Sequence, residues 1–211
     1  MRGACGTPGA ASEARWTVVA TPSTMMALGT SAPDFQLPDL TTRTVSRNDF
    51  AEHPALLVMF ICNHCPYVKH VVGEIARVGR EYQERGVAVV AISSNDVEQY
   101  PEDGPASMAE FAAANGFTFP YLYDETQAVA QAYRAACTPD FFLFDAGRRL
   151  VYRGQLDGAR PSNEEPVDGR DLRAALEATL AGRPVAETQL ASLGCNIKWR
   201  PGNEPAYAPG R

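Results

Sequence analysis

Two cysteines, Cys62 and Cys65, are separated by two residues, and this spacing allows them to close a small disulfide ring. The pair follows a continuous apolar run, residues 55–61, and precedes a stretch with helical periodicity. A thiol at the start of a helix lies near unpaired N–H groups and the positive end of the helix dipole, which favour an anion. Because the thiolate reacts in disulfide exchange, we expect a lowered pKa at Cys62. The pattern predicts Cys62 as the nucleophile and Cys65 as the residue that resolves the mixed disulfide.

The residues inside and beside the pair, Asn63, His64 and Pro66, are expected to tune its reactivity. A protonated His64 stabilises the Cys62 thiolate and makes the disulfide more oxidising; alternatively, its ring points into solvent. Pro66 has no N–H, and the first turn of a helix tolerates this. A structural zinc site needs a second pair of ligands, and the sequence has no second Cys-x-x-Cys and no His-x-x-x-His. We therefore expect no metal and no cofactor.

The elements that must position this motif form a strand–helix–strand unit. The run at residues 55–61 has no polar alternation, which is typical of a strand buried on both faces. Apolar residues then recur on one helical face up to Tyr82, and Arg85 and Gly86 end the helix. A second apolar run, residues 87–93, predicts the next strand. Such a unit favours two parallel strands joined by a right-handed crossover.

The other expected elements complete an α/β domain. A strand within residues 32–39 pairs with residues 44–46 as a hairpin, followed by a helical turn that begins at Ser46. Further expected elements are a helix at 108–115, a strand at 119–123, a helix at 126–136, a hairpin from 141–144 and 150–154, and a helix at 171–180. We expect a central mixed β-sheet flanked by helices, with an N-terminal β-hairpin extension. The predicted organisation is a disordered leader at 1–24, a domain at 25–181 and an irregular tail at 182–211.

Composition limits the function further. The chain has 211 residues and a net charge of −6, which argues against nucleic-acid or anionic-membrane partners. It contains no run of 18 apolar residues, so no membrane span is expected. Five cysteines is an odd number with only one regular spacing, which disfavours a disulfide-stapled secreted scaffold. One redox pair in a reducing compartment fits better, and we expect a cytoplasmic protein.

Strand, Cys-x-x-Cys-Pro, long helix, strand and a later Thr138-Pro139 before a β-hairpin together resemble the thioredoxin superfamily. Residues 29–35 are similar to the start of redoxin domains, the branch that holds peroxiredoxins and TlpA-like proteins. Residues 60–66 and 194–199 resemble a group of bacterial thioredoxin-like proteins. The resemblance implies a thioredoxin fold and thiol–disulfide oxidoreductase activity on protein or small-molecule disulfides and thiols. It also implies that Thr138-Pro139 is a cis peptide facing the disulfide, where Thr138 binds the substrate chain; the alternative is an ordinary trans proline.

Two departures from these families affect the expected chemistry. Thioredoxins carry a buried acid on the strand before the motif, and residues 55–61 contain none, so Asp140, Asp145 and Glu74 are the candidate proton carriers. Peroxiredoxins have a Thr three residues before the reactive cysteine, and this chain has Met59 there. Because Met59 cannot donate a hydrogen bond to a peroxide, it argues against efficient peroxidase activity.

Two alternatives to the oxidoreductase stay open at this stage. One is a thiol-dependent peroxidase with an antioxidant role, which the redoxin-like N-terminal half supports. The other is a metal-binding or copper-delivery protein, a use of this scaffold that needs a Cys-x-x-x-Cys pair and a distal His. The direction of exchange and the reductase partner are not determined by the motif, because the reduction potential decides between reduction, oxidation and isomerisation.

The remaining cysteines give further candidates for redox chemistry. Cys137 lies two residues before Pro139, and we expect either a small buried hydrophobe or a partner for Cys195. A Cys137–Cys195 pair would act as a tail clamp or a second redox relay, with Ile197 and Trp199 anchoring the tail. Cys5, in the leader, is expected to be free. The charged segments at 96–103 and 157–168 are interpreted as solvated surface.

Overall fold

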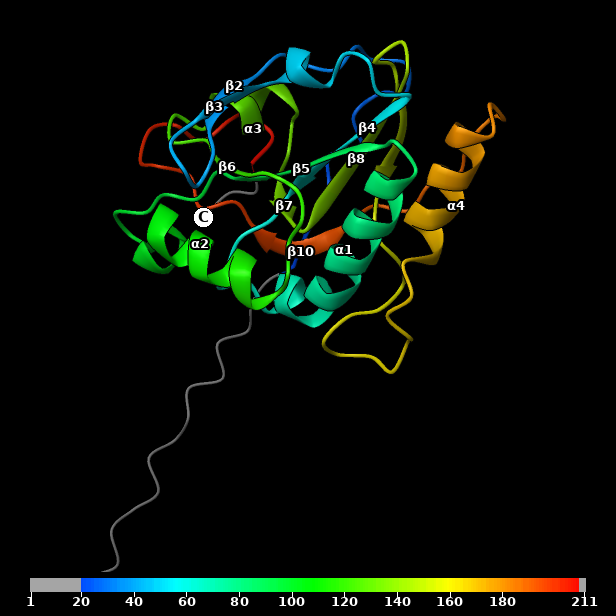
Figure 1. Cartoon of the computed structure of the whole chain (residues 1–211). Helices are drawn as coiled ribbons and strands as arrows, with labels where there is room; N and C mark the ends of the chain where they lie inside the picture. Colours follow the sequence, from blue (N-terminus) through cyan, green and yellow to red (C-terminus); the bar gives the residue numbers. More distant parts are fainter. Residues whose placement is uncertain (1–19, 209–211) are drawn as a thin grey trace, which may run out of the picture.

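The computed structural model describes residues 20–208, and its centre is a five-stranded mixed sheet with the strand order β6-β5-β4-β8-β9 (Figure 1). The expected mixed sheet is thus confirmed. Strands β4, β5 and β6 are parallel to one another, whereas β8 and β9 form an antiparallel hairpin against β4. The bounds are β4 (Ala55–Phe60), β5 (Ala88–Ser93), β6 (Tyr121–Tyr123), β8 (Asp140–Asp145) and β9 (Leu150–Gly154).

Helices and a hairpin cover the two faces of this sheet. Helices α1 (Pro66–Glu84) and α4 (Arg170–Leu180) lie together on one face, while α2 (Pro105–Ala114) packs beside β6 (Figure 1). The other face carries α3 (Ala128–Ala132) and the hairpin of β2 (Gln36–Pro38) and β3 (Thr44–Ser46), followed by the 3₁₀ turn η1 (Arg47–Phe50). Strand β4 is buried at every position, with Leu57 and Met59 packed on the α1 side. Val58 and Phe60 pack on the opposite side, so the apolar run serves two cores.

Several predicted elements are shorter in the structure, and two of them have a clear physical reason. The helix expected at 126–136 is confined to α3, because Gln127 and Arg134 have φ angles of 63° and 53°. These left-handed conformations interrupt a right-handed helix on both sides. The strand expected within 32–39 is reduced to β2, which ends at Pro38, a residue without an N–H donor.

The C-terminal segment differs from the irregular tail that the sequence predicts. Residues Leu193–Asn196 form strand β10, which lies between β1 (Thr21–Pro22) and β7 (Cys137–Thr138) in a three-stranded antiparallel sheet (Figure 1). Ile197 and Trp199 are buried in the core on the α3 side, as expected for anchors, and burial of such side chains contributes roughly 1.5–3 kcal/mol each. Strand β1 also shows that part of the expected leader belongs to the fold; residues 1–19, with Cys5, lie outside the described residues.

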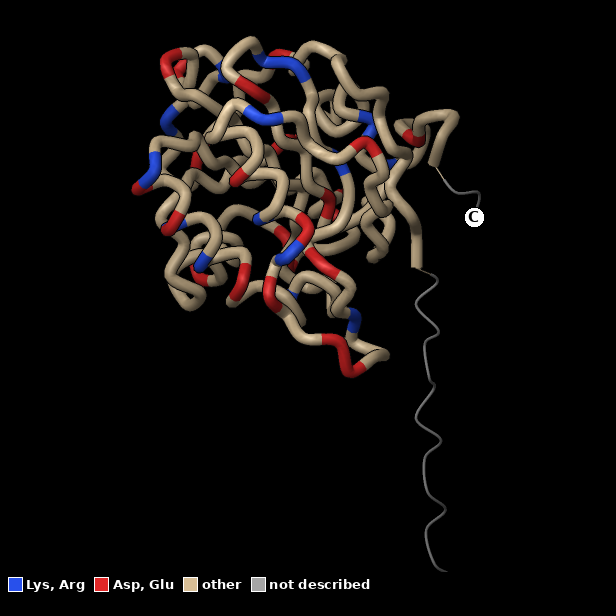
Figure 2. Tube along the Cα trace, turned by 90° about the vertical axis from the view of Figure 1, so that its right-hand side faces the viewer, with Lys and Arg blue, Asp and Glu red and all other residues tan. Residues whose placement is uncertain are grey.

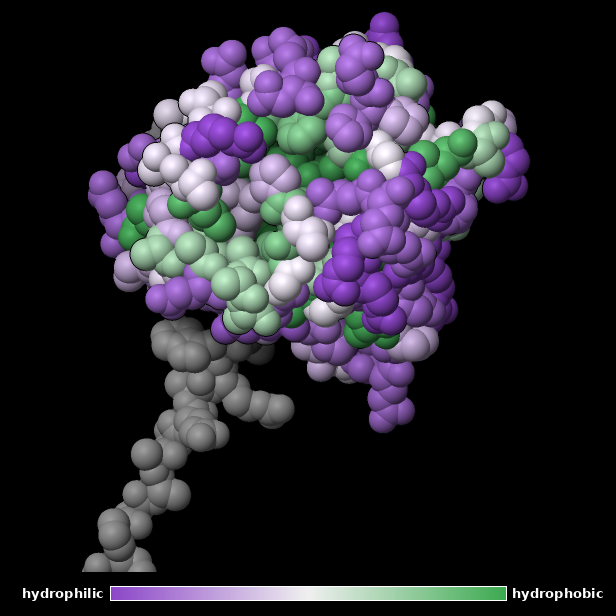
Figure 3. All heavy atoms as spheres, viewed as in Figure 1, coloured by the Kyte–Doolittle hydropathy of each residue, from purple (hydrophilic) through white to green (hydrophobic). Residues whose placement is uncertain are grey.

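The surface agrees with the acidic, mixed-charge composition. Figure 2 shows Lys and Arg interspersed with Asp and Glu along the side in view. On the face of Figure 1, hydrophilic residues predominate, and a pale apolar area lies over α2, where Ala106, Ala109 and Ala113 are exposed (Figure 3). No helix within residues 20–208 has the length and apolarity that crossing a bilayer requires.

Candidate active site

Three sulfur atoms, two from the β4–α1 connection and one from β10, meet at the start of α1. Cys62 follows β4, Cys65 is the residue that caps the N-terminus of α1, and Cys195 lies in β10. The Sγ atoms of Cys65 and Cys195 are 2.9 Å apart, and all three residues are buried free thiols. Pro66 occupies the first turn of the helix, as predicted. The pair therefore lies at a strand–helix junction, and the fold adds a third cysteine to it.

The acidity of the cluster centres on Cys65 and differs from the prediction for Cys62. Hydrogen bonds from the Cys195 and Cys62 thiols, together with the backbone N–H of Val68, lower the pKa of Cys65 to about 2. Burial and the interaction with Cys65 raise the pKa of Cys62 well above its usual value. The expected low pKa at Cys62 is thus wrong in this structure. The reason is that two neighbouring thiols and the Val68 N–H stabilise a thiolate at Cys65, whereas burial, Cys65 and the Asp103 carboxylate oppose one at Cys62.

Both cysteines of the motif contact Thr138, the residue before a cis proline. The Thr138–Pro139 peptide is cis, which confirms the expectation. Cys65 Sγ lies 3.2 Å from the Thr138 carbonyl oxygen, and Cys62 Sγ lies 3.3 Å from Thr138 Oγ1. Cys195 is the register partner of Thr138 across the β10–β7 pair. The backbone edge beside the cis proline is therefore occupied by the chain's own C-terminal strand.

His64 is held by the buried carboxylate of Asp103, a residue that the sequence predicts to be on the surface. Its Nδ1 lies 2.6 Å from Oδ2 of Asp103, and its ring stacks on Tyr100 with centroids 5.5 Å apart. The hydrogen bond with Asp103 raises the pKa of His64, which favours the imidazolium form. Burial opposes ionisation of Asp103, but the hydrogen bond from His64 prevails and its pKa is lowered. The Cys62 Sγ atom and the ligand atoms of this pair lie within 4.8 Å of one another, so the imidazolium is close enough to affect the thiol.

Asp103 also organises the loop between the two cysteines. Its Oδ1 accepts the backbone N–H of Asn63 at 2.8 Å and of His64 at 3.2 Å, and its Oδ2 accepts Nδ2 of Asn95. The signal for this residue lay in the topology, because loops that follow parallel strands β4 and β5 leave the sheet at the same edge. The ligand atoms of Cys62, His64 and Asp103 lie within 4.8 Å of one another, and hydrogen bonds engage both oxygens of Asp103.

Asn63 points inward and fixes the loop from the other side. Its Nδ2 donates to the carbonyl oxygen of Glu102, and its Oδ1 accepts a hydrogen bond from the Tyr121 hydroxyl at 3.0 Å. The residue is buried, so its role is to position the loop rather than to contact solvent. An open groove beside this loop is lined by Asn63, His64, Lys69, Glu102, Phe111 and Ala114, next to the apolar surface of α2 (Figure 3).

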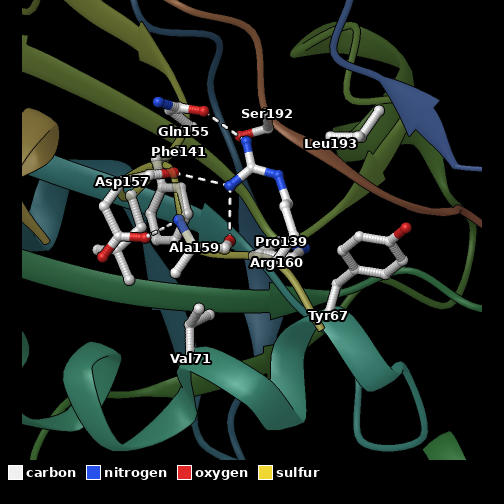
Figure 4. Close-up of a pocket in the computed structure, with 11 residues that line it drawn as sticks. Tyr67, Val71, Pro139, Phe141, Gln155, Asp157, Ala159, Arg160, Ser192 and Leu193 are labelled. Atoms are coloured by element: carbon white, nitrogen blue, oxygen red, sulfur yellow. Dashed lines mark hydrogen bonds between the residues drawn. The ribbon is translucent and has the colours of Figure 1, made fainter. Parts of the chain in front are cut away.

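A small pocket lies on the other side of the cis proline (Figure 4). It is lined by Tyr67, Pro139 and Leu193, and the guanidinium of Arg160 lies over it. Arg160 donates to the carbonyl oxygens of Asp157 and Ala159, both at 2.7 Å. Asp157 is buried and accepts backbone N–H groups, including that of Ala159. This part of the segment at 157–168 is therefore structural, which corrects its interpretation as solvated surface.

The remaining candidates lie outside the sulfur cluster. Cys137 is buried, faces Asn196 in the register and has its closest hydrogen-bond acceptor in the Pro139 carbonyl oxygen, 3.9 Å away. The sulfur partner of Cys195 is Cys65, which differs from the expected pair with Cys137. Asp140 is fully buried with Oδ2 lacking a partner, and burial raises its pKa well above the usual value. The other two proton candidates are otherwise engaged: Glu74 pairs with Arg173 at 2.8 Å, and Asp145 binds backbone in a turn.

Comparison with known proteins places this site in a family. A model of the AhpC/TSA family matches residues 28–153, which include Cys62, Cys65 and the cis proline. The chain belongs to the AhpC/TSA family. This AhpC/TSA protein is 54% identical to an uncharacterized conserved protein from Geobacillus kaustophilus, whose crystal structure has a TM-score of 0.85; the match covers 87% of this chain and 97% of that chain.

Two more distant matches bear on the fold and on the general function. A crystal structure of a thiol:disulfide interchange protein of the thioredoxin family, from Chlorobium tepidum TLS, has a TM-score of 0.56 at 17% identity and covers 73% of this chain and 98% of that chain. The thioredoxin fold is thereby confirmed. Thiol-disulfide oxidoreductase ResA from Geobacillus thermodenitrificans (strain NG80-2) is 28% identical over 132 residues, 62% of this chain and 70% of that protein. The family match and the ResA similarity support a redoxin with oxidoreductase-like function.

Proposed function

We propose that the protein is a thiol–disulfide oxidoreductase in which Cys62 and Cys65 form the redox pair. One thiolate attacks a substrate disulfide and forms a mixed disulfide, releasing the first substrate thiolate. The second cysteine then attacks the enzyme sulfur of that mixed disulfide, which closes the Cys62–Cys65 bond and releases the second substrate thiolate. Two electrons pass from the protein dithiol to the substrate, and the reverse sequence oxidises a substrate dithiol.

One observation supports this proposal most directly. Both sulfurs lie against Thr138 beside the cis Pro139, at 3.2–3.3 Å, and Cys65 caps a helix whose N–H groups stabilise a thiolate. In the reduced site the thiolate form is favoured at Cys65, and the neighbouring Cys62 thiol helps to stabilise it. Trapping with single variants assigns the attacking residue: Cys62 is the nucleophile if Cys65→Ser, and not Cys62→Ser, accumulates the mixed disulfide.

The substrates we propose are protein or small-molecule disulfides and thiols that reach the edge of Thr138 and Pro139. Tyr67 and the guanidinium of Arg160 border this edge and supply an aromatic surface with one positive charge (Figure 4). The His64–Asp103 pair lies beside Cys62 and fixes the loop between the two cysteines, which supports the chemistry by positioning the thiols. A reducing compartment such as the cytoplasm suits this proposal, since the reduced pair must be regenerated by a reductase partner.

Peroxidase activity has weaker support. The residue three positions before Cys62 is Met59, which is fully buried in β4 and offers a peroxide no hydrogen-bond donor. Family membership alone does not restore that contact. Consumption of hydrogen peroxide coupled to a dithiol reductant measures this activity directly, and we expect a rate far below that of disulfide reduction.

Insulin reduction tests the proposed function. Under dithiothreitol, the wild-type protein is expected to accelerate precipitation of the insulin chains, and Cys62→Ser and Cys65→Ser are each expected to lose at least about 100-fold in rate. Cys137→Ser is the matched control, because this cysteine is equally buried but lies outside the sulfur cluster. Wild-type activity in Cys62→Ser would contradict the proposal, as would no exchange with either insulin or oxidised glutathione.

A further inference from the structure

We propose that Cys195 is a third redox cysteine, which exchanges with Cys65 and thereby links the C-terminal strand covalently to the site. This proposal rests on the proposed function, because it needs a Cys62–Cys65 disulfide as its starting point. Cys195 lies beyond residues 28–153, the segment that the AhpC/TSA family shares. Cys195 therefore reaches the site from outside the segment that matches the family model.

The position of Cys195 is fixed by strand pairing on both sides. In β10, Cys195 is the register partner of Thr138, and the preceding Gly194 is the partner of Thr21 in β1. A Cβ atom on Gly194 would lie 2.0 Å from the Thr138 carbonyl oxygen, so only glycine permits β10 to approach β7 this closely. This approach brings the Cys195 sulfur to 2.9 Å from that of Cys65. The backbone pairing of β10 therefore positions Cys195 next to Cys65, and the contact does not depend on the rotamer of one side chain alone.

β10 occupies the place that we propose for an external substrate chain. It pairs antiparallel with the residue before the cis proline and presents a sulfur to the redox pair, as a substrate cysteine would. All three sulfur-bearing residues are at most 4% exposed with the strand in place. Cys195 is thus an internal substrate, and an external chain reaches the site when β10 moves aside.

The exchange step is balanced without an added oxidant. In the form with a Cys62–Cys65 disulfide, the deprotonated Cys195 sulfur attacks the Cys65 sulfur. The Cys65–Cys195 bond forms, the Cys62–Cys65 bond breaks, and Cys62 leaves as the thiolate that takes up the proton given by Cys195. No net oxidation occurs, so the Cys62–Cys65 and Cys65–Cys195 disulfide isomers have the same oxidation state. The isomer with a free Cys62 is ready to attack a second disulfide, whereas a reductant that opens Cys65–Cys195 restores the fully reduced site.

Cys137 provides the internal comparison. It lies in β7, one residue from Thr138, and is also buried, but its register partner is Asn196 and its sulfur has no sulfur partner among the described contacts. Burial alone therefore does not distinguish the two cysteines. The strand register does, because it places the sulfur of Cys195, and not that of Cys137, against Cys65.

Disulfide mapping in Cys62→Ser tests the exchange partner. After oxidation with oxidised glutathione, tryptic peptides 48–69 and 174–198 are expected to be joined, with the loss of two hydrogen atoms relative to the two free peptides. The double variant Cys62→Ser/Cys137→Ser is expected to give the same cross-link, and Cys62→Ser/Cys195→Ser is expected to give none. A Cys65 that stays free or carries only glutathione in Cys62→Ser overturns the proposal.

A second measurement uses the wild-type chain and needs no substitution. When one disulfide is formed per protein, alkylation is expected to label Cys62 in part of the population and Cys195 in the rest. If alkylation labels Cys195 and never Cys62, the Cys62–Cys65 disulfide does not exchange with Cys195, and the proposal is wrong. Insulin reduction distinguishes this proposal from the proposed function. If the protein reduces insulin but forms no Cys65–Cys195 cross-link, only the role of Cys195 is contradicted. If the wild type shows no disulfide exchange at all, the proposed function is contradicted.

Discussion

Cys65 and Cys195 lie with their sulfurs 2.9 Å apart although 130 positions separate them in the chain. The contact joins the cap of α1 to a strand near the C-terminus, and it changes how charge is distributed at the site. The interactions with the Cys195 and Cys62 thiols lower the pKa of Cys65, so neighbours as well as the helix favour its thiolate.

Removing the Cys195 thiol should raise the pKa of Cys65. In Cys195→Ala, Cys65 loses its main hydrogen-bond donor, so we expect its pKa to rise by at least about one unit. The thiolate absorbance of the reduced protein, followed against pH, measures this shift. Cys195→Ser keeps a donor and should restore most of the acidity, and Cys137→Ala should leave it unchanged. An identical midpoint in Cys195→Ala and the wild type would show that Cys195 does not stabilise the thiolate.

The His64–Asp103 pair should stabilise the fold within a limited pH window. The pKa of His64 is raised in the fold by Asp103, so its contribution is complete below the unfolded value of about 6.5 and disappears as pH rises through the folded value. The pKa of Asp103 is lowered, so its contribution is complete above about 3.8 and falls when pH drops through the folded value. Relative to His64→Gln, we expect the wild type to be about 1–2 kcal/mol more stable near pH 5.5 than near pH 9.

Urea unfolding of the reduced proteins at the two pH values checks this prediction. His70→Gln is the matched control, because His70 is exposed on α1 and has none of these partners. The pair is not the stabilising element if the difference between wild type and His64→Gln is the same at both pH values.

Because of Asp140, the free energy of unfolding should decrease as pH rises. It is buried with one oxygen unpartnered, and burial raises its pKa, so the folded protein holds the proton after the unfolded chain has lost it. Above about pH 3.8, stability is therefore lost until pH passes the folded value, by up to about 1.4 kcal/mol per pH unit. Asp140→Asn keeps the shape and does not titrate, so its advantage over the wild type should grow with pH. Denaturant unfolding across this range, with Asp34→Asn at an exposed position as control, measures it; an advantage that is constant with pH contradicts the assignment.

Much of the scaffold was predictable because its patterns are local. The apolar runs before Cys62 and after Gly86 gave the two parallel strands, and the periodic apolar face between them gave α1. The cis peptide before Pro139 followed from the resemblance rather than from any local pattern. The helix expected at 126–136 was too long, since the left-handed backbone at Gln127 and Arg134 is not encoded by side-chain hydropathy.

By itself, the sequence determined that a dithiol motif stands between a buried strand and a helix, because spacing and periodicity are properties of neighbouring residues. Only the tertiary structure decided that Cys195 meets Cys65, that Asp103 is buried against His64 and that the low pKa belongs to Cys65. Each depends on hydrogen bonds between segments far apart in the chain. Such contacts follow from how β10 and the loop after β5 pack, which hydropathy does not specify.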